Sequence, residues 1–313
     1  MKCLYWILFL CVGLGSCSGS ADKKYNDDTA TSGSITIAAD ESLLPIVEAE
    51  IEVFQSIYPE AHIRVIYTNE YDAIDLMCKD SARLAIVTRG LLPEERAAFE
   101  RDQITPRFSP FAYDAIAILL NRKINDTIFS SQQIAGILSG EIKTWNDLNP
   151  ASAADPIRVI FDSPKSGITR YCNDSLLKGK SLGKQSFAVD GNRKVIDEVE
   201  KDPNTIGLIG ITWISDQDDS LSRGFINRIR VASLVVQQPA EAATMKPFQA
   251  YIALKQYPLW REVQIISREA RVGLGTGFAS FIASDKGQRI VLKSGLVPAK
   301  APIRIIQINN KNL

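Results

Sequence analysis

Strand-like apolar runs alternate with helix-like segments early in this 313-residue chain, and this order restricts the possible folds more than any other sequence feature. Three mainly apolar segments, at 35–39, 63–67 and 84–88, have the length and composition of strands. The segments between them, at 46–57 and 72–77, carry apolar residues at helical spacing. Successive strand and helix units of this kind predict a parallel sheet with helices on its faces.

The alternation resumes after Pro110, which indicates a second lobe. A third phase begins near Tyr251 and continues toward the end of the chain. We therefore expect an α/β protein of two lobes, with a ligand bound in the crevice at the C-terminal ends of the strands. The further expected elements are strands at 116–120, 157–161, 207–211 and 303–308, and helices at 91–100, 131–138 and 278–292.

Residues 1–16 have the features of an export signal. Lys2 supplies a positive start, and the apolar core at 3–14 is too short to span a bilayer. The tetrad LGSC at 14–17 resembles a bacterial lipobox, which implies cleavage before Cys17 and lipid attached to that residue. Several acyl chains would anchor such a lipoprotein stably to a membrane surface without spanning it. The alternative is ordinary signal cleavage in which Cys17 has no role.

The segment that follows, through residue 33, is rich in Ser, Gly, Asp, Lys and Thr, so 17–33 is predicted to be a lipidated cysteine followed by a flexible tether. Residues 34–313 leave 280 for folding (313 minus 33), enough for two medium lobes. Removal of the signal also removes Lys2, so that 35 of the 36 Lys and Arg residues remain, against 36 Asp and Glu residues. A nearly neutral chain without a basic stripe argues against nucleic acid as a partner.

Few residues are suited to metal or catalytic chemistry. His62 is the only histidine, so metal clusters and Ser/His/Asp triads are not expected, and no cofactor is implied. Cys78 and Cys172 are interpreted as two buried thiols, although an oxidising compartment would allow them to pair. Asp40 and Glu41 are the only candidate catalytic carboxylates, and neighbours on an extended strand end point apart. We therefore expect no enzyme activity.

The stretch FDSPKSGITR, at 161–170, has the order of an anion-binding loop: a strand, a Ser-Gly turn and the start of a helix. Ser166 would add a hydroxyl donor, Gly167 would let the backbone approach a ligand, and Arg170 would supply a charge. The alternative is an ordinary helix N-cap.

Several longer motifs carry a family resemblance. AYDAIA at 112–117, followed by SQQIAGILSGEIKTWNDL at 131–148, resembles the signature of phosphate-specific ABC-transporter substrate-binding proteins. IGLIG at 206–210, YPL at 257–259 and SDKGQRIVLKSGLVP at 284–298 follow in the family's order. The resemblance covers nearly all of the chain after the tether.

This resemblance implies the type II periplasmic-binding-protein fold, in which two lobes are joined by two crossing segments and close over a small ligand. Each lobe would be a mostly parallel sheet flanked by helices. By the same resemblance the chain crosses near Phe111 and Phe248. The first lobe would then be 34–111 with 248–313, and the second 112–247.

The family's ligand residues can be matched to this chain one at a time. Ser42 matches the first loop, Thr68 the second, and Thr88-Arg89 keep the family's Ser-Arg pair. The third loop keeps Ser166 and Gly167, with Thr169 and Arg170 one residue further along. The implied ligand residues are Ser42, Thr68, Thr88, Arg89, Ser166, Gly167, Thr169 and Arg170.

The chain also departs from the family at six other positions in or near these loops. Carboxylates stand where the family has small, hydroxyl or arginine residues, an arginine replaces its aspartate, and an isoleucine replaces a threonine. A carboxylate that faces divalent phosphate repels it unless protonated or turned away. Together with Arg89, the charged departures suit a mixed-sign pocket for a zwitterion or another small polar solute; the alternative is that some of these side chains face solvent. The departures are Asp40, Glu41, Glu70, Arg83, Asp162 and Ile168.

The sequence thus predicts a monomeric extracytoplasmic solute-binding protein, anchored by lipid to a bacterial membrane and facing the periplasm. It would bind phosphate or a related small oxyanion and deliver it to the permease subunits of an ABC transporter, without catalysis. The alternative is a binding, sensing or interaction module for a different small polar or zwitterionic ligand.

Overall fold

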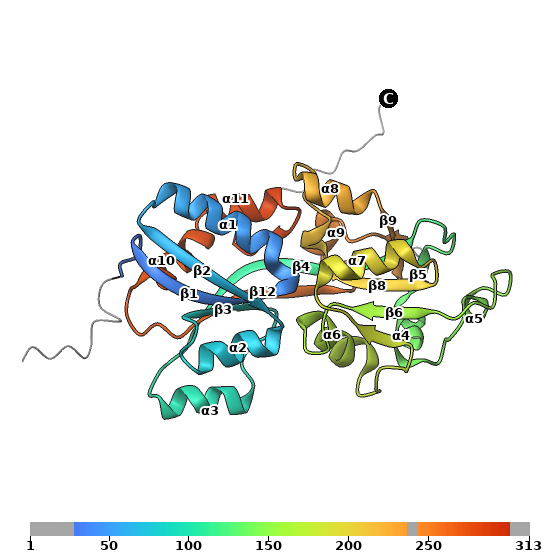
Figure 1. Cartoon of the computed structure of the whole chain (residues 1–313), viewed down its shortest axis with the longest axis horizontal. Helices are drawn as coiled ribbons and strands as arrows, with labels where there is room; N and C mark the ends of the chain where they lie inside the picture. Colours follow the sequence, from blue (N-terminus) through green and yellow to red (C-terminus); the bar gives the residue numbers. More distant parts are fainter. Residues whose placement is uncertain (1–27, 237–242, 301–313) are drawn as a thin grey trace, which may run out of the picture.

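Two α/β lobes lie side by side and are joined by two long strands (Figure 1). The computed structural model describes residues 28–236 and 243–300. The predicted signal, most of the tether and the strand expected at 303–308 lie outside these residues. The strands that pass between the lobes are β4 (Arg107–Asn121) and β12 (Trp260–Ser267).

The first lobe combines the beginning of the chain with its end. β1 pairs in parallel with both β2 and β3, as the alternation of strands and helices predicted. The helix expected at 278–292 is two helices, because the Ser284 side chain caps a new helix that starts at Asp285. The elements of this lobe are β1 (Gly33–Asp40), a 3₁₀ turn (Glu41–Leu43), α1 (Leu44–Ile57), β2 (Ala61–Thr68), α2 (Glu70–Cys78), β3 (Leu84–Val87), α3 (Pro93–Arg101), α10 (Leu274–Ile282), α11 (Asp285–Lys293) and β13 (Val297–Pro298).

The second lobe repeats the parallel arrangement, since β6 pairs in parallel with both β7 and β8. A separate small sheet has the order β11-β10-β5. The elements of this lobe are β5 (Ile128–Ser130), α4 (Ser131–Ser139), α5 (Trp145–Leu148), β6 (Arg158–Phe161), α6 (Gly167–Tyr171), a π-helical turn (Cys172–Leu177), β7 (Ser186–Ala188), α7 (Asn192–Lys201), β8 (Thr205–Gly210), a 3₁₀ turn (Ile211–Trp213), α8 (Ser220–Ile226), β9 (Ile229–Val231), β10 (Ser233–Val236) and β11 (Ala243–Met245). The next helix, α9 (Gln249–Ala253), is bonded to the first lobe, because the Gln249 side chain donates to the carbonyls of Leu292 and Leu296.

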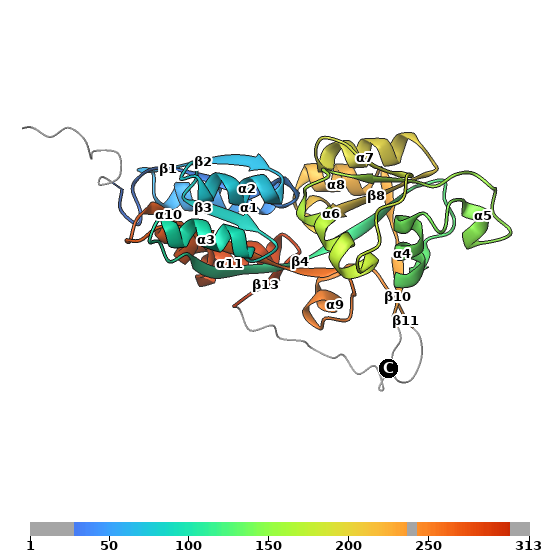
Figure 2. The same cartoon turned by 90° about the horizontal axis from the view of Figure 1, so that it is seen from below.

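β4 is the element that makes the two lobes one sheet. Its residues 107–115 pair with β12, and its residues 116–120 pair with β8. The strand predicted at 116–120 is therefore the second half of a 15-residue strand. The strand order through both lobes is β2-β1-β3-β12-β4-β8-β6-β7, and Figure 2 shows β4 passing from one lobe to the other.

Neither thiol of the folded part is paired: Cys172 is buried, and Cys78 is only partly buried, which corrects the expectation that both would be buried. Within 28–236 and 243–300, no helix combines the length and apolar character needed to cross a membrane.

α1 packs its apolar face into the first lobe, where the Phe54 ring lies 5.3 Å from that of Phe278 in α10. Glu50 lies on the same face and is 0 % exposed. Neither of its carboxyl oxygens has a hydrogen-bond partner among the described residues. Burial raises the pKa of Glu50 to about 9, so this side chain is neutral at pH 7.

Glu50 makes stability depend on pH. Its pKa is higher in the folded chain than in the unfolded chain, so its contribution is fully present at low pH and is lost as the pH rises through about 9. Between pH 6 and 8, Glu50 should make the unfolding free energy of the wild type fall by about 1.4 kcal/mol per pH unit. The Glu50→Gln protein should lack this contribution to the pH dependence. Urea unfolding at both pH values measures this. The exposed neighbour Glu52 gives the control, Glu52→Gln, and equal pH slopes in wild type and Glu50→Gln would contradict the prediction.

Candidate functional site

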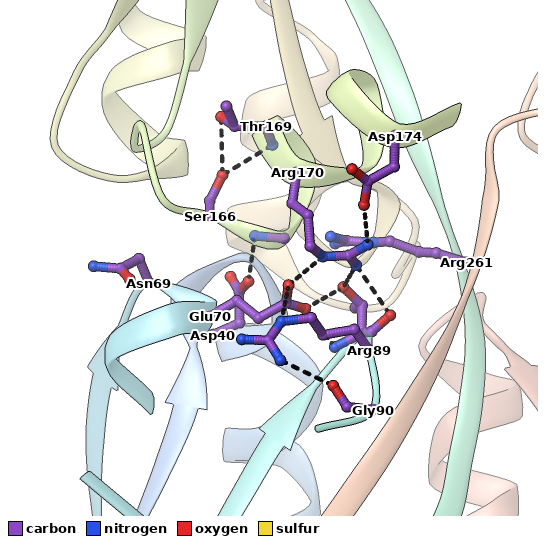
Figure 3. Close-up of polar contacts among 12 residues, drawn as sticks. Asp40, Asn69, Glu70, Arg89, Gly90, Ser166, Thr169, Arg170, Asp174 and Arg261 are labelled. Carbon is purple, nitrogen blue, oxygen red and sulfur yellow. Dashed lines mark hydrogen bonds and ion pairs between the residues drawn. The ribbon is translucent and has the colours of Figure 1, made fainter. Parts of the chain in front are cut away.

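The C-terminal ends of strands from both lobes meet beside the crossing strands (Figure 3). Asp40 is the last residue of β1, Thr88 follows β3, and Asp162 follows β6. All three side chains are buried. The alternative that some of the charged loop residues face solvent therefore does not hold for Asp40 and Asp162, nor for Glu70, which is also buried.

Glu70, the first residue of α2, is the most heavily hydrogen-bonded acid of this site. Its Oε1 accepts bonds from the Thr88 backbone N–H at 2.8 Å and the Thr88 hydroxyl at 2.6 Å. Its Oε2 accepts a bond from Nε of Arg170, in the second lobe, at 2.5 Å. Burial opposes ionisation of Glu70, but the Arg170 charge and these donors outweigh it and lower the pKa. Glu70 is therefore an ionised carboxylate surrounded by donors.

Two arginines flank Glu70 in different ways. Arg170 reaches across the interface and also donates to the Thr88 carbonyl and hydroxyl, each at 3.1 Å. Arg89 lies with its Nε 3.6 Å from Glu70, but its terminal nitrogens form two 2.7 Å bonds to Glu95 in its own lobe. Arg170 is thus the arginine that connects the lobes here.

Asp40 makes a second connection between the lobes. Its carboxylate accepts the Ser42 N–H at 2.9 Å within the first lobe and the Gly167 N–H at 2.8 Å from the second. Burial, and then the nearby charge of Glu70, raise the pKa of Asp40, and the positive charge of Arg261 offsets only part of this.

The adjacent carboxylate, Glu41, points to a different partner, as expected for neighbours on a strand end. It accepts hydrogen bonds from the backbone and side-chain nitrogens of Asn192, at the start of α7. Asn192 also donates to Asp162 at 3.2 Å. Burial and the Asp40 charge raise the pKa of Asp162 to about 7, so its charge changes near neutral pH.

The hydroxyls of the third loop are bonded within the loop. Ser166 donates to Asp162 at 2.6 Å and accepts the Thr169 N–H at 3.2 Å, which is the N-cap arrangement. The Thr169 hydroxyl donates to the Ser163 carbonyl at 2.6 Å. Ile168 is buried in the apolar core, so the residue that departs from the family pattern packs instead of binding.

An ion pair joins the two crossing strands below this site. Arg261 of β12 donates through Nε to Asp114 of β4 at 2.8 Å, and both side chains are almost fully buried. Arg261 also donates to the Ser42 hydroxyl at 2.9 Å, which fixes the loop after β1. Sequence reasoning missed Asp114, Arg261 and Asn192. For Asp114 and Arg261 the available signal was a charged residue within a strand, whereas Asn192, at the start of α7, gave no such signal.

Of the predicted ligand residues, Ser42, Thr88, Ser166, Gly167 and Arg170 all have contacts in this group. Thr68 ends β2 beside Asp40, at its paired position in the sheet. Arg83 does not join them. It precedes β3, at the opposite end of that strand from Thr88, and lies 4.0 Å from Glu269. Its inclusion in a mixed-sign pocket was wrong, because Arg83 lies at the opposite end of β3 from the interface.

The described residues contain no group of three or more His, Cys, Asp or Glu side chains that could hold a metal ion.

The sequence model of the family described as "PBP superfamily domain" matches residues 26–286. Among curated proteins, phosphate-binding protein PstS of Pseudomonas aeruginosa is 22 % identical over 318 residues, covering 95 % of this chain and 94 % of that protein. Phosphate-binding protein PstS of Bacillus subtilis is 20 % identical over 296 residues, covering 93 % and 90 %.

Solved structures share the fold. A putative phosphate ABC transporter substrate-binding protein from Clostridium perfringens, solved with bound phosphate, superposes with a TM-score of 0.72 at 23 % identity, over 86 % of this chain and 100 % of that one. An ABC-type phosphate transport receptor from Vibrio cholerae gives a TM-score of 0.61 at 22 % identity, over 84 % and 99 %. These likenesses confirm the two-lobed architecture expected from the sequence.

The contacts that a side chain at Gly167 would make show how closely the two lobes approach each other. A Cβ there would lie 2.6 Å from the Thr88 hydroxyl, 2.8 Å from Asp40 Oδ2 and 2.9 Å from Glu70 Oε1, all from the first lobe. Gly167→Ala should therefore disfavour this closed arrangement by about 1–3 kcal/mol, and small-angle X-ray scattering should show a larger radius of gyration.

The matched control is Gly224→Ala in the same lobe, because a Cβ at Gly224 meets nothing within 4 Å. A Gly167→Ala protein with the scattering profile of the wild type would show that the lobes do not approach in this way in solution.

Proposed function

Because this chain belongs to the PBP superfamily, we propose that it is an extracytoplasmic solute-binding protein that binds phosphate or a related small oxyanion between its lobes for uptake through an ABC permease. Support comes from the names of its relatives, which describe phosphate-binding proteins over nearly their whole length. Its own residues supply the more direct argument.

The observation that carries the proposal is the set of donors around Glu70. The backbone N–H and hydroxyl of Thr88 and the guanidinium of Arg170 converge from two lobes on one pair of carboxylate oxygens. Charge-assisted donors of this kind also bind the oxygens of phosphate. A small oxyanion in this position would therefore be held by both lobes at once.

The mechanism is binding followed by closure, with no bond made or broken in the solute. We place the lobe boundaries at 34–111 with 248–313 and at 112–247, so that the chain passes between the lobes near Phe111 and Phe248. Asp114 on β4 and Arg261 on β12 form an ion pair, and Arg261 also holds the Ser42 loop. Neither a cofactor nor a metal has a part in this mechanism.

The second candidate function rests on the acids of the interface. Asp40 and Asp162 lie near Arg261, and Glu70 lies near Arg89 and Arg170, while Glu41 is next to Asp40 in the sequence. A site of both signs suits a zwitterionic or other small polar solute. The chain would then be a binding, sensing or interaction module with an altered phosphate site.

We further propose that cleavage before Cys17 leaves a lipid-anchored monomer, with 17–33 as the tether and the lobes facing the periplasm. The sequence LGSC at 14–17 supports this. Cys17→Ala should move the protein from the membrane fraction to the soluble fraction, whereas Cys78→Ala should not. Membrane retention of the Cys17→Ala protein would contradict the anchor.

Isothermal titration with inorganic phosphate at pH 7, with sulfate for comparison, tests the proposed ligand. The mature chain carrying Cys17→Ala should bind phosphate. Arg170→Ala should weaken binding about tenfold or more, because it removes a charged donor. Arg193→Ala, an exposed arginine of the same lobe, is the control. Absence of heat with either anion would favour the polar or zwitterionic ligand instead.

A further inference from the structure

We propose that Glu70 is a tethered competitor of the ligand: its carboxylate occupies the donors that an oxyanion would use, and it thereby sets the oxyanion affinity of the protein. This inference rests on the proposed function, because it names the residue that limits that function. Figure 3 shows Glu70 between Arg170 of the second lobe and Arg89 of the first.

The contacts of Glu70 are those of a bound anion. Both of its oxygens are used, one by the two donors of Thr88 and the other by Arg170. Arg89 adds a positive charge at 3.6 Å. Three of these groups, Thr88, Arg89 and Arg170, are among the residues that the family resemblance assigned to the ligand.

The start of α2 does not need the Glu70 side chain. Asn69 caps the helix by accepting the Asp72 N–H at 3.0 Å, and its amide donates to the Asp72 carboxylate at 2.7 Å. A buried carboxylate is unfavourable unless donors satisfy it. The ion pair across the interface is therefore the interaction that accounts for a buried, ionised Glu70.

The space around Gly167 is too small for Glu70 and an anion together. Even a methyl group at Gly167 would approach oxygens of Thr88, Asp40 and Glu70 to within 3 Å. An anion next to the ionised Glu70 would also be repelled in a site with little water. Binding therefore requires the Glu70 carboxylate to leave Thr88 and Arg170.

Competition of this kind lowers the observed affinity without removing a donor. The ligand binds only the fraction of molecules in which Glu70 has moved away, so the apparent dissociation constant rises in inverse proportion to that fraction. An amide at position 70 has the same shape but no charge, and its NH₂ group would face the Arg170 guanidinium or the Thr88 donors. The donors would then be more readily available to a ligand.

The test is titration of the mature chain, carrying Cys17→Ala, with inorganic phosphate at pH 7. Glu70→Gln and Glu70→Ala should bind phosphate at least tenfold more tightly than the parent. Asp72→Asn is the matched control: Asp72 also forms an ion pair between the lobes, with Lys165 at 3.7 Å, but lies outside the donors around Glu70. It should bind as the parent does.

The outcomes separate this inference from the proposed function. Phosphate binding by the parent that equals or exceeds that of both Glu70 variants would overturn the role of Glu70 and leave the proposed function in place. Absence of binding in the parent and in both variants, each folded by circular dichroism, would overturn both. An equal gain in Asp72→Asn would assign the effect to net charge and overturn the competitor role.

Discussion

The buried ion pair between Asp114 and Arg261 is the interaction on which the arrangement of the interface depends. The two residues stand directly opposite each other on β4 and β12, the strands that pass between the lobes. Each buried charge would be strongly unfavourable alone, so each side chain fixes the other. Since Arg261 also binds the Ser42 hydroxyl, the loop that carries Asp40 is held at the crossing point.

Around this fixed point the lobes are joined mainly by acids of one lobe and donors of the other. Asp40 binds the Gly167 N–H, Glu41 binds Asn192, and Glu70 binds Arg170. The first lobe thus places its own carboxylates against groups of the second lobe that are suited to an anion. This explains how a chain with the fold of phosphate-binding proteins can keep a Thr-Arg pair and a Ser-Gly turn at the family's positions and still carry carboxylates in the neighbouring loops.

The sequence predicted the fold well because strand and helix periodicities are local. The strands that end at Asp40 and before Asp162 follow from short runs of residues, whereas the order of the strands in the sheet came from the structure. The sequence predicted one helix at 278–292, where the structure has two. Apolar periodicity did not reveal the break, because a single capping residue, Ser284, starts the second helix.

The site was only partly predictable because its contacts are distant in sequence. Glu70 and Arg170 are 100 residues apart, and a charged residue after a strand has the same local pattern whether it meets solvent or a second lobe. The burial of Asp40 and Asp162 therefore had to come from the structure. The prediction for Arg83 was wrong for a related reason. Arg83 was matched to a family position from the sequence alone, which does not show which end of β3 faces the interface.

A crystal structure of the mature chain with saturating inorganic phosphate would test most directly whether Glu70 occupies an anion site. We expect phosphate between the lobes, bonded to the Thr88 N–H and the Arg170 guanidinium, with the Glu70 carboxylate turned away from both. An interface free of phosphate, with Glu70 still bonded to Arg170, would contradict the proposal that these donors form an oxyanion site.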